Sequence, residues 1–160
     1  MLTPSPKPIV AQPVVFAAPQ RIAVRVYYED TDFSGSVYHA SYLRFLERGR
    51  TEFLRKLGIE HRELFAGGGK GGLHFAVRSM TIEFLRPALM DDELAVETCV
   101  LALGGASIEM RQEITHGEQV LLTADVRIAI VAGGKARRLP PEILAKLKPC
   151  TLTPIKRKRM

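Results

Sequence analysis

The sequence lacks tryptophan, has only two cysteines and contains no long uninterrupted apolar run. Cys99 and Cys150 form no CxxC motif and have no histidine at metal-ligand spacing, so neither a disulfide framework nor a metal site is indicated. The apolar stretch 120–132 is interrupted by Asp125 and Arg127, whereas a membrane-spanning helix needs about 20 apolar residues. We therefore expect no transmembrane segment, a reducing compartment and a cytoplasmic location.

Positive charge is scarce in most of the chain, although the formal net charge is +6. Residues 1–134 contain 14 Lys and Arg against 16 Asp and Glu, whereas residues 135–160 contain 9 against 1. The basic character belongs to the C-terminal segment, and we expect no nucleic-acid partner for the domain. A basic end such as Lys156–Arg159 can contact a polyanion, but it is also typical of a solvated terminus.

Proline is concentrated at the N-terminus, where five of the ten prolines lie within residues 1–20. This composition favours a disordered, extended leader over residues 1–19. A secretory signal is a weak alternative, because the apolar stretch 9–18 is short and is broken by Pro13. The sequence predicts one domain over residues 20–148, followed by a basic tail over residues 149–160.

Hydrophobic periodicity predicts the order of the elements. Residues 21–28 alternate between two faces, which is typical of a half-buried strand. From Tyr38 to Leu57 apolar residues recur every three or four positions, which predicts a helix of about 19 residues ended by Gly58. A short helix is predicted from Pro140–Pro141 to Leu147. The four further predicted strands are residues 73–86, 93–103, 107–115 and 119–131.

Short turns separate these four strands, so they must be antiparallel neighbours. A long helix with one apolar face needs a sheet to cover it. The predicted fold class is therefore α+β, with a long central helix wrapped by a five-stranded antiparallel sheet. Gly49 lies on the apolar face of this helix and would allow the sheet to approach closely.

Carboxylates, serines and a histidine are concentrated between the first strand and the helix, in residues 28–39. In one interpretation Asp32 and Ser34 or Ser36 cap the helix. A calcium loop is a second interpretation, because Asp30, Asp32 and Ser34 match the opening spacing of an EF-hand. Ser41 stands where that loop needs a bidentate glutamate, and a strand precedes it, so calcium binding is not expected.

Catalysis is the third interpretation. A helix N-terminus presents free amides that stabilise an oxyanion, and a carboxylate beside it can activate water or attack a carbonyl. Asp32 precedes the predicted helix and His39 lies in its first turn, so both could face one carbonyl group. Gly35-Ser36 lacks the GxSxG elbow of serine hydrolases.

Residues 28–52, YEDTDFSGSVYHASYLRFLERGRTE, closely resemble the signature of the YbgC-like acyl-CoA thioesterases, within the 4-hydroxybenzoyl-CoA thioesterase group. Residues 77–88, VRSMTIEFLRPA, followed by Asp91-Asp92, share this resemblance, and residues 103–140 do so more weakly. The resemblance implies the hot-dog fold, a helix wrapped by an antiparallel sheet, which agrees with the periodicity. It also implies an acyl-CoA substrate, with no metal or redox cofactor.

The resemblance implies roles for individual residues. Asp32 matches the essential acidic residue, which acts as general base on water or as nucleophile. His39 matches the position that begins the helix, where the backbone amide polarises the thioester carbonyl. Tyr28 matches a tyrosine that lines the pocket, and Gly35 and Tyr38 are expected beside the substrate. Relatives usually have a small aliphatic residue where this chain has serine at position 36.

Three cations are candidates for the phosphates of coenzyme A. Arg78 and Arg86 lie on the strand after the glycine-rich loop 67–72, which contains Lys70. The loop does not match a Walker motif, because the required first glycine and the final serine or threonine are missing. A strand arginine is also typical of a solvated face, so both interpretations of Arg78 and Arg86 stay open.

The leading hypothesis is an acyl-CoA thioesterase. The alternative is a non-catalytic hot-dog module that binds acyl groups or acyl carrier protein, because a fold does not fix a function. A five-stranded sheet leaves long edges that need pairing, so we expect a homodimer or homotetramer. The acyl preference, the carrier and the choice between general-base and covalent catalysis stay open.

Overall fold

The computed structural model describes residues 19–67 and 72–151. Lys70, nearly all of the predicted leader and most of the predicted basic tail lie outside these residues. The expected tail begins at residue 149, yet Cys150 is buried and Thr151 forms a parallel bridge with Val100. The folded part of the chain therefore continues to residue 151.

One antiparallel sheet has the strand order β1-β3-β4-β5-β2, with β6 paired to β5. Its strands are β1 (Gln20–Arg25), β2 (His74–Phe84), β3 (Glu93–Leu103), β4 (Ser107–His116), β5 (Gln119–Ala132) and β6 (Lys135–Ala136). The sequence predicted the five long strands and missed β6. Gly133 and Gly134 both have positive φ, and such a pair forms the tight hairpin turn that leads into β6.

The helices are α1 (Ser41–Lys56), α2 (His61–Gly67) and α3 (Pro141–Leu147), with short 3-10 helices η1 (Tyr28–Asp30) and η2 (Lys148–Cys150). The long helix α1 has 16 residues and begins at Ser41, not near Tyr38 as predicted. The Tyr38 N–H donates to the carbonyl of Asp30, so this residue belongs to the preceding loop. Gly58 follows α1 with a φ of +73°, the left-handed stop that the sequence predicted.

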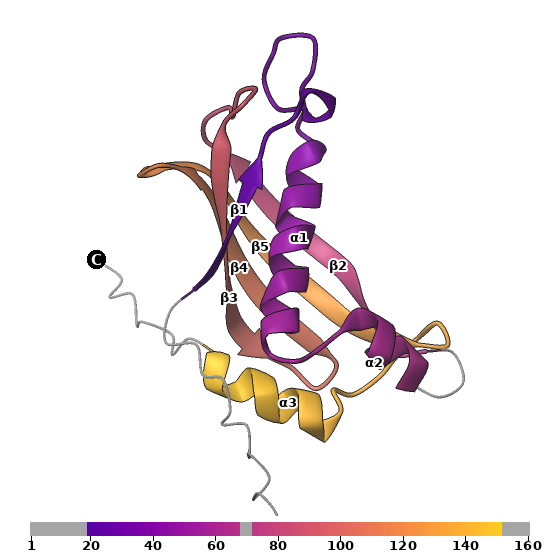
Figure 1. Ribbon diagram of the computed structural model, residues 1–160. Coiled ribbons are helices and arrows are strands. Elements are labelled where there is room, and N and C mark those ends of the chain that lie inside the picture. Colours follow the sequence, from indigo (N-terminus) through magenta and orange to yellow (C-terminus); the bar gives the residue numbers. More distant parts are fainter. Residues whose placement is uncertain (1–18, 68–71, 152–160) are drawn as a thin grey trace, which may run out of the picture.

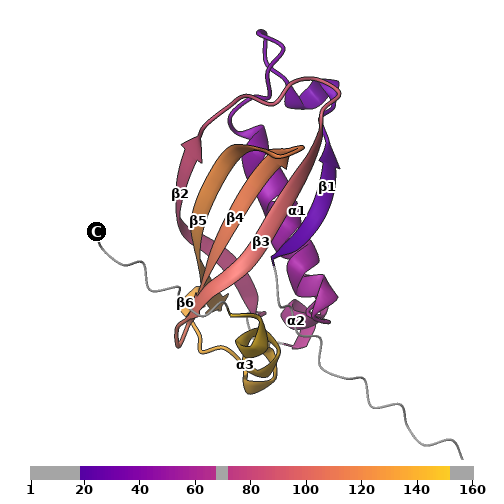
Figure 2. The same cartoon turned by 90° about the vertical axis from the view of Figure 1, so that its left-hand side faces the viewer.

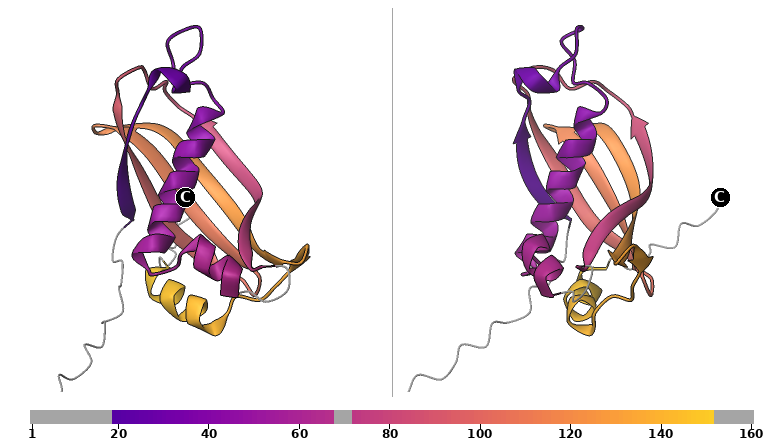
Figure 3. Two further views of the ribbon diagram at one scale, coloured as in Figure 1. Left: turned by 45° about the vertical axis from the view of Figure 1, so that its right-hand side comes forward. Right: turned by 90° about the vertical axis from the view of Figure 1, so that its right-hand side faces the viewer.

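The sheet curls around α1, which lies against its inner face (Figures 1 and 3). Figure 2 shows the outer face, formed mainly by β3, β4 and β5. Helix α1 contacts β1, β3 and β4. The loop that precedes α1 lies at one end of the helix, and α2 and α3 lie at the other (Figure 1). The predicted α+β class with a curled antiparallel sheet is confirmed.

No helix within residues 19–67 and 72–151 has the length and apolar composition needed to cross a membrane. The cytoplasmic location stays a prediction.

Gly49 marks the closest approach of α1 to the sheet, as the sequence predicted. A Cβ atom at this position would lie 2.7 Å from Val96 Cγ1 and 2.9 Å from Gln112 Nε2. Both distances are shorter than van der Waals contact, and both neighbours are fully buried in the sheet. Glycine at position 49 therefore sets the spacing between the two layers.

Substituting Gly49 tests this spacing. In Gly49→Ala, the higher helix propensity of alanine should raise the free energy of unfolding by about 1 kcal/mol. Overpacking at the same position typically lowers it by about 1–3 kcal/mol. We expect a net loss of stability, seen as a lower Tm and a lower denaturant midpoint. Gly105→Ala is the matched control, because a Cβ atom there meets nothing within 4 Å. Equal stability of the two variants would contradict the close approach.

Candidate active site

The loop before α1 is closed by its own backbone hydrogen bonds. The Asp32 N–H donates to the Ser36 carbonyl at 2.9 Å, and the Gly35 N–H donates to the Asp32 carbonyl at 3.0 Å. Gly35 has a φ of +82°, a conformation that glycine adopts without strain. Thr31 and Val37 form a bridge at the base of this loop. The segment from Asp32 to Ser36 is therefore a tight turn with a defined shape.

Among residues 19–67 and 72–151, the Asp32 carboxylate accepts hydrogen bonds only within this turn. Its Oδ1 atom accepts from the Ser34 N–H at 2.8 Å and from the Ser34 hydroxyl at 2.6 Å. The N-cap of α1 is Ala40, and no side chain caps this helix. The interpretation in which Asp32, Ser34 or Ser36 caps α1 is therefore wrong, because these side chains contact only groups of their own turn among the described residues.

The two aspartates of this region have different environments. Asp30 is buried, and its Oδ2 accepts the Tyr27 N–H at 2.9 Å, so it has a structural role at η1. Asp32 is exposed. The Ser34 hydroxyl and N–H lower the pKa of Asp32 below its ordinary value of 3.8, and the charge of His39 adds a smaller effect in the same direction. Asp32 is therefore ionised at neutral pH and accessible.

His39 lies two residues before α1, not in its first turn as predicted. A turn occupies this position because the Ser41 N–H donates to the Tyr38 carbonyl at 2.8 Å. Within the described chain, the N–H groups of His39 and Ala40 have no hydrogen-bond acceptor. The His39 ring packs against Tyr38, with 4.5 Å between the ring centroids. Two free amides and an imidazole thus lie between the Asp32 turn and α1, and the imidazole lowers the pKa of the Asp32 carboxyl group.

Tyr28 lies on η1, just before the Asp32 turn. The alternation in the sequence predicted that Tyr28 shares the buried face of Val24 and Val26, and this is wrong. Strand β1 ends at Arg25, and Tyr28 begins η1 with 84% of its surface exposed. No hydrogen bond or ring contact joins Tyr28 to Asp32 in the described part of the chain. Its predicted role in the pocket stays a prediction.

The two candidate arginines are separate from the Asp32 turn along the chain. Arg78 lies at a register shift in β2, between Val77 and Ser79, and its side chain is exposed. Arg86 follows β2 and is also exposed, while its N–H donates to the Leu121 carbonyl. Neither guanidinium is paired with another described residue, so both can bind an anion. Lys70 lies outside the described residues.

Apolar side chains are exposed around the turn between β2 and β3, beside the Asp32 turn. Leu89 bridges to Ser36 and is 51% exposed, and Phe84 packs on Tyr42 and is 53% exposed. We call these half-exposed side chains the apolar rim: Tyr38, Phe84, Leu85, Leu89 and Met90. Sequence reasoning found only Tyr38 in this rim. The other four lie at the end of β2 or in the turn after it, and only the fold shows that the turn between β2 and β3 contacts Ser36.

A cleft of about 580 Å³ lies at the opposite end of α1, between α2, α3 and the end of β5. Ile59, Leu64, Ile143 and Arg138 are among its lining residues, and it contains none of the predicted site residues that the structure describes. The described residues contain no cluster of three metal-ligating side chains. We therefore take the Asp32 turn, and not this cleft, as the candidate active site.

Comparison with known proteins identifies the family of the chain. Residues 26–147 match the model of the thioesterase-like superfamily. The acyl-CoA thioester hydrolase YbgC of Escherichia coli is 43% identical over 131 residues, covering 80% of this chain and 95% of that protein. The acyl-CoA thioesterase YbgC of Haemophilus influenzae is 42% identical over 124 residues, covering 76% and 89%.

Solved structures show the same similarity. A probable thioesterase from Bartonella henselae is 50% identical with a TM-score of 0.74, covering 77% of this chain and 100% of that one. A thioesterase from Thermus thermophilus, crystallised with coenzyme A and Zn, is 26% identical with a TM-score of 0.69, covering 80% and 91%. The family resemblance seen in residues 28–52 is thus confirmed over most of the chain. The chain belongs to the thioesterase-like superfamily, whose hot-dog fold it shares.

Proposed function

We propose that this protein hydrolyses acyl-CoA thioesters at the Asp32 turn. The class of reaction, thioester hydrolysis, follows from membership of the superfamily. One observation supports the site: Asp32 is an exposed, ionised carboxylate that does not cap α1, and two free amides lie between its turn and the start of α1. The reaction uses a carboxylate, backbone amides and water, and requires no metal or redox cofactor.

The proposed mechanism has two parts. The thioester carbonyl oxygen accepts hydrogen bonds from the free N–H groups of His39 and Ala40, which stabilise the oxyanion as it forms. Asp32 then takes a proton from the attacking water, or attacks the carbonyl carbon itself to give an anhydride that water opens. In both routes the carbon–sulfur bond breaks, and the thiolate leaves with the electron pair and is then protonated. The two routes differ in whether an acyl-enzyme forms.

The apolar rim provides a surface for the acyl group. Arg78 and Arg86 are free cations for the phosphates of coenzyme A or of a carrier-protein arm. The names of the YbgC relatives refer to acyl-CoA, which favours coenzyme A as the carrier here. A non-catalytic module that binds acyl groups or acyl carrier protein would need no free carboxylate at position 32. Substitution of Asp32 separates the two functions.

Asp32→Asn is the direct test of the proposed reaction. The amide keeps the size of the side chain but can neither accept the proton of water nor attack the thioester. We expect kcat to fall by at least about a hundredfold, while circular dichroism and Tm stay close to those of the unchanged protein. Hydrolysis is measured by thiol release from acyl-CoA substrates of several chain lengths.

His39→Ala serves as the comparison variant, because it removes the imidazole and keeps the backbone amide. We expect a smaller loss than for Asp32→Asn. An equal loss would assign the imidazole a direct role. Normal turnover by a folded Asp32→Asn protein would reject the mechanism and favour the binding module.

Ser34→Ala should move the pKa of Asp32. The Ser34 hydroxyl is the largest cause of the lowered pKa, and the substitution leaves the backbone N–H of residue 34 in place. We expect the pKa of Asp32 to rise toward 3.8, so the loss of ionised Asp32 with falling pH starts at a higher pH. Carboxyl-carbon NMR titration measures the shift, and an unchanged or lower pKa would contradict the hydrogen-bond assignment.

We further propose a homodimer, or a homotetramer built from such dimers. Among the described strands β2 pairs only with β5, so no described strand covers the other edge of this 11-residue strand. Val77 on this strand and the neighbouring Phe84 and Leu85 are about half exposed. A long free edge with apolar side chains favours pairing with another copy. The second copy would also cover the apolar rim.

Light scattering should give a mass of at least twice the 17.8 kDa of one chain at micromolar concentration. Val77→Lys should shift the protein toward monomers, because a lysine on a strand edge opposes edge pairing. Ala145→Lys is the control, since this residue is exposed on α3 and distant from the β2 edge. A monomeric unchanged protein, or equal masses for the two variants, would contradict pairing through β2.

A further inference from the structure

One buried residue in the turn between β2 and β3 contacts both halves of the candidate site. Ala88 is fully buried, and its N–H donates to Tyr42 Oη at 2.9 Å. Its carbonyl accepts the Val37 N–H at 2.9 Å. Tyr42 lies in the first turn of α1, and Val37 follows the Asp32 turn. The backbone of Ala88 thus joins the start of the helix to the loop that carries the carboxylate.

A short path of backbone contacts continues from this residue to Asp32. Leu89, the next residue, bridges to Ser36. The carbonyl of Ser36 accepts the Asp32 N–H. A displacement of Leu89 would therefore move Ser36 and then the backbone of Asp32 relative to the free amides before α1.

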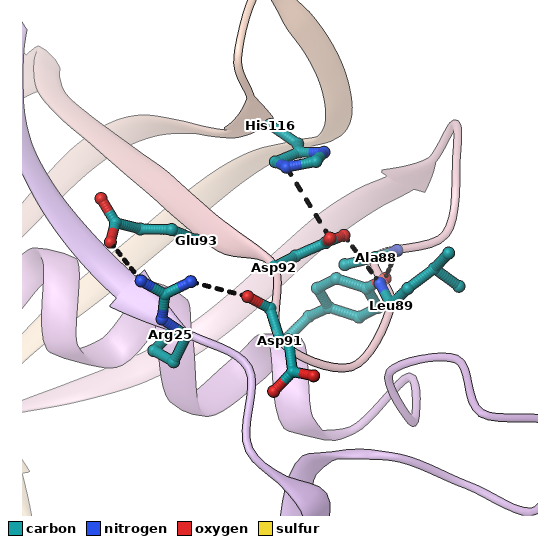
Figure 4. Close-up of polar contacts among 8 residues, drawn as sticks. Arg25, Ala88, Leu89, Asp91, Asp92, Glu93 and His116 are labelled. Atoms are coloured by element: carbon teal, nitrogen blue, oxygen red, sulfur yellow. Dashed lines mark hydrogen bonds and ion pairs between the residues drawn. The ribbon is translucent and has the colours of Figure 1, made fainter.

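The turn itself is held by Asp92 (Figure 4). Its Oδ2 atom accepts the Leu89 N–H at 2.9 Å, and its own N–H donates to the Leu89 carbonyl at 3.2 Å. Between them, Asp91 has a φ of +71°, a conformation that is unfavourable for residues other than glycine. Arg25 donates to the Asp91 carbonyl at 2.7 Å and supports the turn from β1. The turn therefore needs fixed partners to keep its shape.

The side chains of His116 and Tyr42 also contact the turn between β2 and β3. His116, at the end of β4, has its Nε2 atom 3.7 Å from Asp92 Oδ1, which is too long for a hydrogen bond. Burial, together with the charges of Asp92 and Asp32, raises the pKa of Tyr42. The Tyr42 hydroxyl therefore stays neutral and can keep accepting from Ala88. Asp92 Oδ2 accepts from the uncharged N–H of Leu89. This contact therefore needs an oxygen acceptor at position 92 but not a negative charge.

We propose that Asp92 and the Tyr42 hydroxyl are positioning residues: they fix the turn at Ala88 and Leu89, and this turn holds the Asp32 turn in place relative to the start of α1. Neither is a catalytic residue in this proposal, because each acts through backbone groups of the turn. The inference rests on the proposed function. It predicts a larger change in kcat than in KM, since the free arginines and three of the five side chains of the apolar rim lie outside the turn that Asp92 holds.

The test compares Asp92→Ala with Asp92→Asn. Alanine removes the acceptor of the Leu89 N–H, whereas asparagine retains a carbonyl oxygen and loses only the charge. We expect kcat to fall between about tenfold and a hundredfold for Asp92→Ala, the range for a small misplacement of a reacting group. Asp92→Asn should restore most of this loss. Failure of asparagine to restore kcat would overturn the proposal, because the charge and not the acceptor would then matter.

A double-substitution cycle links the effect to Asp32. If Asp92 acts by positioning Asp32, adding Asp92→Ala to Asp32→Asn should cause little further loss of kcat. Full additivity would overturn the proposal. The control is Asp125→Ala, which breaks the exposed pair with Arg111 on the outer face and should leave kcat unchanged.

Tyr42→Phe provides a second variant in case Asp92→Ala does not fold. It keeps the aromatic ring in the core and removes only the acceptor of the Ala88 N–H, so a similar loss of kcat is expected. Unchanged kcat for Tyr42→Phe would overturn the part of the proposal that concerns Tyr42. Failure of the proposed function is distinguishable, because Asp32→Asn would then keep its activity in the same assay, whatever the Asp92 variants do.

Discussion

The contact between α1 and the sheet at Gly49 determines where the ends of this helix lie. Gln112 reaches the helix at this point: its Nε2 donates to the Leu46 carbonyl at 2.9 Å and to Thr98 Oγ1 at 2.8 Å, and its Oε1 accepts from Arg50. A fully buried amide with all these partners rigidifies the contact, because loss of any one would leave a polar group unsatisfied. The helix can neither slide nor rotate freely on the sheet, so the position of its first amides is fixed.

The fold was largely predictable from periodicity, for a physical reason. Strands β3, β4 and β5 each bury one face, so their side chains alternate and their bounds can be read to within two residues. Helix α2 was missed because none of its residues is buried, and an unburied helix carries no apolar stripe. The start of α1 was placed too early because Tyr38 continues the apolar spacing, although its N–H is bonded to the loop.

The candidate site was predictable in its residues but not in its geometry. The carboxylates and His39 were visible as a local concentration of polar groups, and the family resemblance singled out Asp32. The sequence could not show that Asp32 accepts hydrogen bonds from Ser34 instead of capping α1. The shape of the turn depends on backbone angles, which residue types alone do not determine. The contact between Tyr42 and Ala88 joins residues 46 positions apart, so only the folded chain shows it.

The register shifts in the sheet have a consequence for the length of the chain. They place one extra residue each in β2, β3 and β5, namely Arg78, Leu101 and Leu121. A single-residue deletion inside a regular strand turns every following side chain to the other face. Deleting one of these extra residues instead joins two neighbours that already alternate, so both flanking segments keep their faces. Single-residue differences in length are thus compatible with this sheet at Arg78 and Leu101, with the loss of some of the curvature that encloses α1, but not at Leu121, which is buried and accepts the N–H groups of Leu85 and Arg86.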